Sequence, residues 1–383
     1  MQEGGPLRRT LHRAPELGYR EHATAKTIMQ VLEREGIPVV GRLAGTGIVA
    51  AITRGSSGRT IGLRADMDGL AVTETSGVVY ASTSPGVMHA CGHDGHMAVL
   101  LTAATALARH GEFDGTVILI FQPAEEGGGG AQTMISEGLF ARWPVDHVFA
   151  LHNWPGLPVG HIAVSPGPVM ASTNDFRVLL TGPGGHVAFP HATAPLTSLA
   201  AEIVRGFDAI AGTALDPMTQ AVIATTQIRG GTTVNAHPTS LDIRGTVRAF
   251  SERDVTEIER RMRGVVDRAV HGHRAAGEVT VTSSYPPTVN DRTAARIARD
   301  AALDVVPVHH LHEQRAAMTS EDFAFMLHEQ PGAYLFLGVG DTPALHSPDF
   351  DFPDEAIPVG AALFVAIAER ALRPEDGEAA RAE

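Results

Sequence analysis

The stretch TVILIF, residues 116–121, is a nearly unbroken run of apolar and β-branched side chains, and QPAEEGGGG, residues 122–130, follows it directly. A strand that is apolar at every position is typical of a parallel sheet with helices on both faces. Other strand-like segments alternate with helix-like ones around it, which predicts an α/β fold with a mostly parallel, mixed sheet flanked by helices. The strand-like segments are 47–53, 60–65, 147–151 and 333–339, and the helix-like ones are 23–34, 97–110 and 354–372.

A region with a different order of elements begins near residue 174. It contains strand, helix, strand, strand, helix and strand, the order of a ferredoxin-like α+β sandwich. These elements are expected at 175–181, 195–211, 221–229, 240–250, 254–272 and 278–284. We therefore expect a large domain of residues 1–173 and 286–383, interrupted by an inserted ferredoxin-like domain at 174–285. The charged tail after Pro374 is expected to fray.

The composition excludes several classes of protein. Hydrophobic residues make up 44% and charged residues 19%, as in globular chains. The formal net charge of −13 argues against nucleic acid or an anionic membrane as a partner, because both require a clustered basic surface. The single cysteine, Cys91, excludes an intrachain disulfide and favours a reducing compartment, so we expect a cytoplasmic protein. Neither a signal peptide nor an apolar stretch of membrane-spanning length is recognisable.

Histidine is frequent, with 19 residues, and it clusters in MHACGHDGH, residues 88–96. Cys91 and His93 are two positions apart, so in an extended segment both side chains point to the same side. A thiolate and an imidazole placed in this way can bind one metal ion or two adjacent ones. Asp94 is the predicted N-cap of the helix that follows. The alternative is an inert, buried cysteine beside surface histidines.

Two adjacent carboxylates, Glu125 and Glu126, follow the TVILIF strand. They are therefore expected at the carboxyl end of that strand, where ligands bind in open α/β sheets. One of the carboxylates can bind a metal ion while the other accepts a proton from a bound water. The alternative is a solvated acidic turn. The absence of GK[ST] after the glycines argues against a phosphate-binding loop.

Three more segments place polar side chains after apolar strands or in late loops. RADMDGL, residues 64–70, has Asp66 and Asp68 on one strand face, where either carboxylate could orient an imidazole ligand. ALHNWP places His152 at the end of another strand, and ALHSPDF contains His346. Each of these signals is weak alone, but five segments converge on metal-binding side chains. The predicted ligands of two divalent ions are Cys91, His93, Glu126, His152 and His346.

A dinuclear site of this kind polarises a carbonyl group and acidifies a bound water. Glu125 is then the predicted general base, and later the acid for a leaving amine. The predicted chemistry is hydrolysis of an amide bond.

The motifs resemble a known family, the metal-dependent amidohydrolases, aminoacylases and carboxypeptidases. They are most similar to the branch of hippurate hydrolase, N-acyl-L-amino acid amidohydrolase and auxin-conjugate hydrolase. The resemblance covers nearly the whole chain. It is carried by LHRAPELGYRE (11–21), LRADMDGL (63–70), MHACGHDGH (88–96), FQPAEEG (121–127), LHNWP (151–155), GPGGHVAFPH (182–191), TTVNAHP (232–238), GTVRAF (245–250), TSEDF (319–323) and LHSP (345–348).

The resemblance implies the same five ligands and the same base. It also implies that Asp68, with Asp66 as second choice, orients a metal ligand. His186 of the inserted domain is expected to support the tetrahedral oxyanion, in similar proteins often in the cleft of the partner subunit. Asn235 and Arg248 are expected to hold the substrate carboxylate, which an arginine can pair in bidentate fashion. Glu321 and Asp322 receive no role.

The family implies a homodimer through the inserted domain, which is also expected to close as a lid. The expected activity is hydrolysis of N-acyl or N-aroyl amino acids with two divalent ions, zinc or manganese, with cobalt or nickel possible. One alternative is a dipeptidase or carboxypeptidase with the same machinery. The other is a non-catalytic metal-binding protein, although structural zinc sites usually have four protein ligands and no additional carboxylate base.

Overall fold

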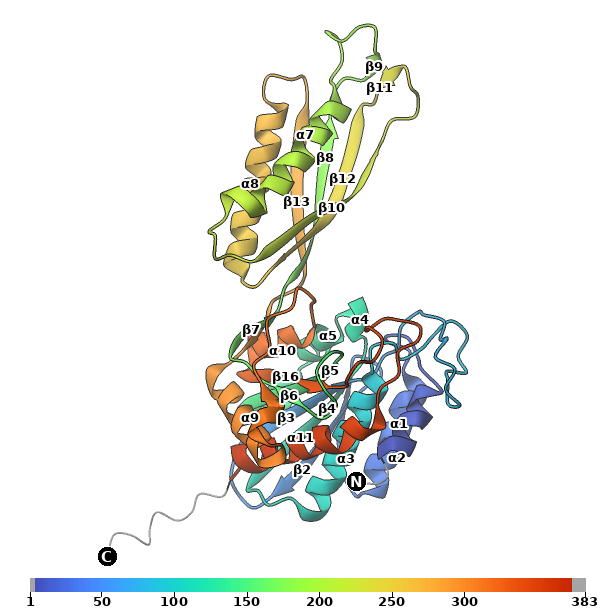
Figure 1. The fold of residues 1–383 in the computed structure, drawn as a ribbon, viewed down its shortest axis with the longest axis vertical. Coiled ribbons are helices and arrows are strands. Elements are labelled where there is room, and N and C mark those ends of the chain that lie inside the picture. The colour runs from blue at the N-terminus through green and yellow to red at the C-terminus, as the bar shows by residue number, and fades with distance from the viewer. Residues whose placement is uncertain (1–3, 374–383) are drawn as a thin grey trace, which may run out of the picture. The chain divides into compact units, whose positions relative to one another are not determined.

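The computed structural model describes residues 4–373, and these residues form two compact units. Within the described residues the first unit comprises 4–167, 289–315 and 322–373, and the second comprises 168–288 and 316–321. The second unit is thus almost entirely one continuous stretch, whereas the first unit is assembled from three separate stretches. Figure 1 shows the elements of both units.

The second unit overlaps the inserted domain expected at 174–285, but it begins at residue 168, ends at 288 and also includes residues 316–321. Its roles as a lid and in dimerisation stay predictions. The charged tail expected after Pro374 lies outside the described residues. Among the helices of residues 4–373, none combines the length and hydrophobicity needed to cross a membrane.

The first unit contains an eight-stranded sheet in the order β1-β2-β4-β3-β5-β16-β6-β15. The four central strands β4, β3, β5 and β16 are parallel, whereas β1, β2 and β4 are joined by antiparallel pairing and β6 runs antiparallel to β16. This confirms the predicted mostly parallel, mixed sheet. The strands are β1 (Val39–Leu43), β2 (Gly47–Arg54), β3 (Thr60–Asp66), β4 (Gly115–Gln122), β5 (His147–Trp154), β6 (Ile162–Ala163), β15 (Leu311–His312) and β16 (Gly332–Gly338).

Helices cover this sheet. Helix α11 packs between α3 and α9, while α5 and α10 contact each other and strands β4, β5 and β16 (Figure 1). The helices are α1 (Gly4–His12), α2 (His22–Arg34), α3 (His93–His110), α4 (Glu125–Gly128), α5 (Gly130–Ser136), α6 (Leu139–Arg142), α9 (Arg292–Val305), α10 (Phe323–Glu329) and α11 (Ile357–Ala371), with 3-10 turns at Val308–His310 and Asp354–Ala356.

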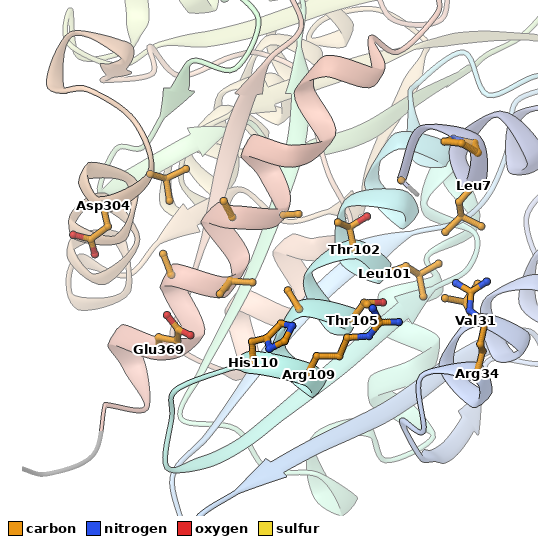
Figure 2. Close-up of a pocket in the computed structure, with 18 of the residues that line it drawn as sticks. Leu7, Val31, Arg34, Leu101, Thr102, Thr105, Arg109, His110, Asp304 and Glu369 are labelled. Atoms are coloured by element: carbon orange, nitrogen blue, oxygen red, sulfur yellow. The ribbon is translucent and has the colours of Figure 1, made fainter. Parts of the chain in front are cut away.

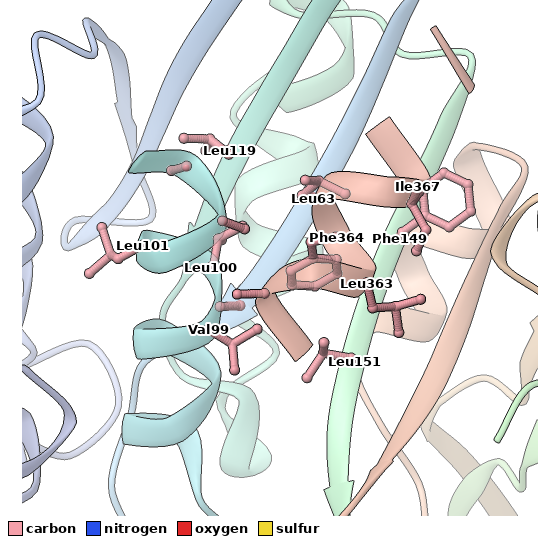
Figure 3. Packing of buried hydrophobic residues seen from close by; sticks show 14 of the residues in the cluster. Leu63, Val99, Leu100, Leu101, Leu119, Phe149, Leu151, Leu363, Phe364 and Ile367 are labelled. Atoms are coloured by element: carbon pink, nitrogen blue, oxygen red, sulfur yellow. The ribbon is translucent and has the colours of Figure 1, made fainter. Parts of the chain in front are cut away.

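The core of the first unit lies between the sheet and the α3–α11 layer. Figure 3 shows Leu100 of α3 and Phe364 of α11 facing Leu63, Leu119 and Phe149 of the central strands. All five side chains are at most 1% exposed. Burying an aliphatic or aromatic side chain of this size contributes about 1.5–3 kcal/mol, so the packing holds the strand ends in fixed positions.

Helix α3 begins differently from the prediction. The cap residue is Gly92, in the left-handed conformation with φ at 87°, and a Cβ there would lie 2.4 Å from Asn153 Oδ1. Asp94 is not the N-cap: it lies inside the first turn and is completely buried. Its carboxylate instead accepts hydrogen bonds from His12 at 2.8 Å and Arg8 at 3.1 Å. Long-range partners, rather than the helix end, determine the position of Asp94.

The second unit has the predicted ferredoxin-like topology. Its antiparallel sheet has the strand order β10-β12-β8-β13, and the helices α7 and α8 pack against it. The elements are β8 (Thr173–Thr181), α7 (Leu196–Ala209), a π-helical turn at Ile210–Ala214, β10 (Ala221–Gly230), β12 (Ser240–Ala249), α8 (Glu252–Val270) and β13 (Ala276–Tyr285). A short pair, β9 (Gly185–His186) with β11 (Ala236–His237), adds a second small sheet. Strands β7 (Gly167–Met170) and β14 (Thr288–Asn290) lie where the chain passes between the units.

Helix α1, which the sequence did not predict, is held by a buried arginine. The Arg8 side chain is fully buried and pairs with Asp94 at 3.1 Å, with Asp351 at 2.8 Å and with Asp354. These three carboxylates come from α3 and from the segment before α11. Arg8 therefore connects the first described helix of the chain to two later parts of the first unit.

Replacing Arg8 by methionine is expected to lower the free energy of unfolding of the first unit by about 3–5 kcal/mol, because the buried carboxylate of Asp94 and the partly exposed ones of Asp351 and Asp354 lose their cation. Arg9→Met is the matched control: Arg9 also pairs with Asp354, but its side chain is 51% exposed, so the loss should stay below about 1 kcal/mol. Urea unfolding followed by tryptophan fluorescence measures this, since Trp143 and Trp154 both belong to the first unit. Equal losses for the two variants would contradict the assignment.

Candidate metal centre

The candidate metal centre lies at the carboxyl ends of the parallel strands. Strand β3 ends at Asp66, two residues before Asp68, and β4 ends at Gln122, three residues before Glu125. His152 lies near the end of β5, and the loop after β16 carries His346. Because β3, β4, β5 and β16 are parallel, these ends meet at one edge of the sheet.

The five predicted ligands come together at this edge in two overlapping groups. In one group the ligand atoms of Cys91, His93 and His152 all lie within 4.8 Å of one another, and in the other those of Cys91, Glu126 and His346 do so. Cys91 belongs to both groups. Donor atoms for two adjacent cations are therefore present, and Cys91 would be available to either of them.

Individual distances show how closely the donor atoms approach. Cys91 Sγ lies 3.5 Å from His152 Nε2, and His346 Nε2 lies 3.1 Å from Glu126 Oε1. His93 Nε2 is 4.0 Å from the same Glu126 oxygen. The first two separations are within hydrogen-bonding reach, and all three also suit donor atoms that surround a cation at about 2.0–2.3 Å.

The hydrogen bonds of the two buried imidazoles leave their Nε2 atoms facing the site. His93 Nδ1 donates to the carbonyl oxygen of Asp68 at 2.9 Å and is 3.2 Å from Asp68 Oδ1. His152 Nδ1 donates to the carbonyl oxygen of Asn153 at 2.8 Å. A proton on Nδ1 leaves a lone pair on Nε2, the arrangement usual for metal-binding histidines. His93 Nε2 is buried and has no hydrogen-bond partner among the described residues, which fits a ligand position.

The electrostatics of His93 also favour a positive charge at this point. Burial lowers the pKa of His93, but Asp66, Asp68 and Glu126 outweigh burial and raise it to about 10. The surrounding carboxylates therefore attract a cation. A divalent ion can take the place of the proton on His93 and satisfy the same negative charges.

The surroundings of the thiol and of the second imidazole favour the neutral form of each group, unlike those of His93. Burial, followed by the carboxylates of Glu126 and Glu125, raises the pKa of Cys91 well above its usual value. Burial and the neighbouring His96 lower the pKa of His152, which keeps this ring neutral. Neutral imidazole binds metals directly, whereas a thiol in this setting needs a nearby cation to ionise.

Glu125 is buried at 7% exposure, and it lies beside the ligand groups, with a carboxylate oxygen within 4.8 Å of ligand atoms of His93 and Glu126. The backbone N–H of Asp322 donates to Glu125 Oε1 at 3.3 Å. Asp322 is fixed in turn, because its carboxylate accepts hydrogen bonds from Arg64 at 3.2 Å and from Ala131 N at 3.0 Å. The sequence gave Asp322 no role, although the acidic pair in TSEDF was a signal that it mattered.

Asp66 and Asp68 have different partners. Asp68 contacts His93 and also accepts a hydrogen bond from the backbone N–H of Glu126 at 3.0 Å. Asp66 lies 2.6 Å from His96 Nδ1 and accepts a hydrogen bond from Arg64 at 2.6 Å. Of the two candidates for the orienting aspartate, Asp68 is therefore the one in contact with predicted ligands through both of its oxygens.

Two residues at the site have a backbone conformation that is unusual for residues with a side chain. Ala124, just before the glutamate pair, has φ at 52°, and His346 has φ at 66°. Hydrogen bonds hold both: Ala124 N donates to Glu21 Oε1 at 2.9 Å, and His346 N donates to Ala90 O at 2.8 Å. Such conformations cost about 1–3 kcal/mol each and persist where the surroundings fix them.

The remaining predicted site residues belong to the second unit. The pairing of β9 with β11 places His186 opposite Ala236, and Val187 N donates to the carbonyl oxygen of Asn235 at 3.1 Å, so the structure brings His186 and Asn235 together. Arg248 lies on β12 and donates to the carbonyl oxygen of Met318 at 3.1 Å. Their roles toward a substrate stay predictions.

A large cavity of about 1130 Å³ in the first unit is separate from this centre (Figure 2). It is lined by α1, α2, α3, α9 and α11, and none of the predicted metal ligands contributes to it. Its α3 residues run from Leu101 to His110, whereas His93 is at the opposite end of that helix, about 25 Å from His110 at 1.5 Å per residue. The cavity is therefore not the metal centre.

Comparison with known proteins places the chain in a family. N-acetyldiaminopimelate deacetylase of Priestia megaterium is 35% identical over 360 residues, covering 93% of this chain and 95% of that protein. IAA-amino acid hydrolase ILR1-like 4 of Arabidopsis thaliana is 34% identical over 376 residues, covering 96% and 85%. The crystal structure of the Bacillus subtilis YXEP protein, described as a dinuclear metal binding peptidase from the M20 family, has a TM-score of 0.86 at 32% identity and covers 96% of both chains.

The family model for peptidase family M20/M25/M40 matches residues 62–370. This range includes every residue predicted above for the metal centre and for the second unit. The chain therefore belongs to peptidase family M20/M25/M40, a family of hydrolases that act on amide bonds.

Proposed function

We propose that this chain is a dinuclear metal-dependent amidohydrolase that cleaves N-acyl or N-aroyl amino acids into a carboxylic acid and a free amino acid. The observation that carries the proposal is the pair of overlapping donor groups that share Cys91, with Glu125 beside them. The names of the relatives, two of which describe a deacetylase and an amino acid hydrolase, support this substrate class.

Each residue of the centre has a role in this proposal. Cys91, His93, Glu126, His152 and His346 would hold two divalent cations, zinc or manganese. When bound, such ions polarise the amide carbonyl and acidify a water molecule. The Glu125 carboxylate accepts the proton of the attacking water and passes it to the leaving nitrogen, while the Asp322 N–H orients it.

The second unit would complete the reaction. His186 would donate a hydrogen bond to the developing oxyanion, and Arg248 with Asn235 would pair with the substrate carboxylate. A homodimer formed through this unit and a cytoplasmic location belong to the same proposal. A dipeptidase or carboxypeptidase with the same machinery is the second candidate, favoured by the similarity to the YXEP protein, which is described as a peptidase.

Removal of metal tests the proposal. Chelator-treated protein is expected to release no amino acid from N-acetyl, N-benzoyl or N-indoleacetyl amino acids, and adding zinc or manganese should restore the release. Dipeptides assayed in parallel separate the two candidate activities. Full activity of rigorously metal-free protein would overturn the proposed mechanism, and cleavage of dipeptides alone would favour the second candidate.

Replacing Asp68 by alanine is expected to weaken metal binding by about 10–100-fold, because His93 and the backbone of Glu126 lose the group that orients them. Competition with a fluorescent chelator measures the affinity. Asp68→Asn is the matched control: it keeps an oxygen that can accept from His93 and should lose less. Unchanged affinity in Asp68→Ala would show that the carboxylate does not orient the ligands.

A further inference from the structure

Four histidines form a second cluster in the first unit, away from the candidate metal centre. They come from two segments that meet where β6 and β15 form the edge of the large sheet. One segment contributes a residue just before β6, and the other contributes a 3-10 turn and strand β15. The histidines are His161, His309, His310 and His312, none of which belongs to a motif discussed above.

The rings of this cluster are in direct contact. His161 Nδ1 lies 2.8 Å from His312 Nε2, and the two rings are inclined by only 14° with centroids 5.0 Å apart, so they meet nearly edge to edge. His310 stacks on His161 with centroids 4.0 Å apart, and His309 packs against His310 at 4.4 Å. The rings of His310 and His312 thus both contact His161, and His309 joins the cluster through His310.

The backbone that carries these rings is fixed by the sheet. Parallel pairing aligns His312 with Ala163, and Val164 N donates to the carbonyl oxygen of His312 at 3.0 Å. On the other side Gly338 N donates to the carbonyl oxygen of His161 at 2.7 Å. The backbone of His161 and of His312 is therefore fixed by hydrogen bonds at the edge of the sheet, as a preorganised site requires.

The cluster is suited to binding a metal ion. His161, His310 and His312 are partly exposed, so an ion can reach them. Burial, together with His310 and His312, lowers the pKa of His161, so this ring is neutral at pH 7 and keeps a lone pair. One of the two facing nitrogens carries the proton of the hydrogen bond between the rings. If that proton moves to the far nitrogen of its own ring, both facing lone pairs become available without net proton release.

We propose that His161 and His312 form a second site for a divalent transition-metal ion, separate from the candidate metal centre, with the ring of His310 stacked beside them. Neutral imidazoles bind zinc, copper and nickel, whereas magnesium and calcium prefer oxygen donors. The site differs from the candidate catalytic centre in having neither thiolate nor carboxylate. An ion bound there connects β6 to β15 and stabilises the edge of the sheet, because it binds only the folded chain.

Equilibrium dialysis of zinc-loaded holoenzyme against Zn²⁺ at pH 7.5 tests the proposal. The wild-type chain is expected to bind one more zinc ion than His161→Gln and His312→Gln. His271→Gln, at an exposed histidine of the second unit, is the matched control and should retain the additional ion. Equal stoichiometry in the wild type and in the two cluster variants would overturn the proposal.

Two further measurements make the result specific. Cu²⁺ added to the zinc-loaded protein should give an electron paramagnetic resonance spectrum with nitrogen couplings that disappear in His312→Gln. Thermal unfolding should shift upward with added zinc in the wild type but not in His161→Gln; an equal shift in both would count against the site. His346→Ala separates this site from the proposed function. This variant should hydrolyse amides more slowly but should still bind the additional zinc ion, the one that His312→Gln loses.

Discussion

Glu125→Gln is expected to lower kcat by about 10²–10⁴-fold, the range for loss of a general acid–base group. Glutamine has nearly the same shape, and its oxygen can still accept the hydrogen bond from Asp322 N. It cannot take a proton from water. The position of the side chain should therefore be kept while its chemistry is lost, so metal content and KM are expected to stay close to those of the unmodified protein.

Glu126→Gln is the matched control at the adjacent position. Glu126 shares a donor group with Cys91 and His346, so its variant is expected to lose metal as well as activity. Elemental analysis and kcat, measured on the same preparations with saturating N-acyl amino acid, separate the two roles. If Glu125→Gln retains normal kcat, or if the two variants lose metal equally, Glu125 is not the base.

Cys91→Ala is expected to have the largest effect on metal content, because its sulfur belongs to both donor groups. The affinity for both ions should fall by more than about 100-fold, since even residues that only orient a ligand account for about 10–100-fold. Activity should fall in parallel. Elemental analysis after dialysis at a fixed free metal concentration provides the measurement.

Two variants, each of which removes a ligand from only one of the two donor groups, serve as controls for the metal content of Cys91→Ala. His152 belongs only to the group with Cys91 and His93, and His346 only to the group with Cys91 and Glu126. His152→Ala and His346→Ala should therefore each lose one ion, whereas Cys91→Ala loses two. Two ions retained in Cys91→Ala would show that the sulfur is not shared.

Local patterns were sufficient to predict most of the fold. The apolar run before Gln122 predicted a strand covered on both faces, and strand β4 lies inside the sheet between β2 and β3. The order of elements in the second unit predicted its topology, since hydrophobic periodicity and turn residues are local properties. Helix α1 was missed because it is short and is held by Arg8, whose partners are far away in the sequence.

The same limit applies to the centre. The five predicted ligands could be proposed because each follows a recognisable apolar segment or lies in a recognisable motif, and the structure brings them together, while their roles stay predictions. The support beneath Glu125 could not be predicted, because Arg64 and Asp322 are separated by 258 positions and meet only through the packing of the sheet. Asp94 was assigned to the wrong role for a similar reason: its partners, Arg8 and His12, precede it by more than 80 positions.

The three-stretch construction of the first unit has a consequence for synthesis on the ribosome. Cys91 and His93 emerge early, but His346 follows only after the whole of the second unit has been made. At about 5–20 residues per second this interval is on the order of tens of seconds. The newly made second unit can fold during that time. The thiol of Cys91 still lacks its neighbour His346 throughout this interval. Oxidation of that thiol in the nascent chain is thus a hazard that the order of the gene itself imposes.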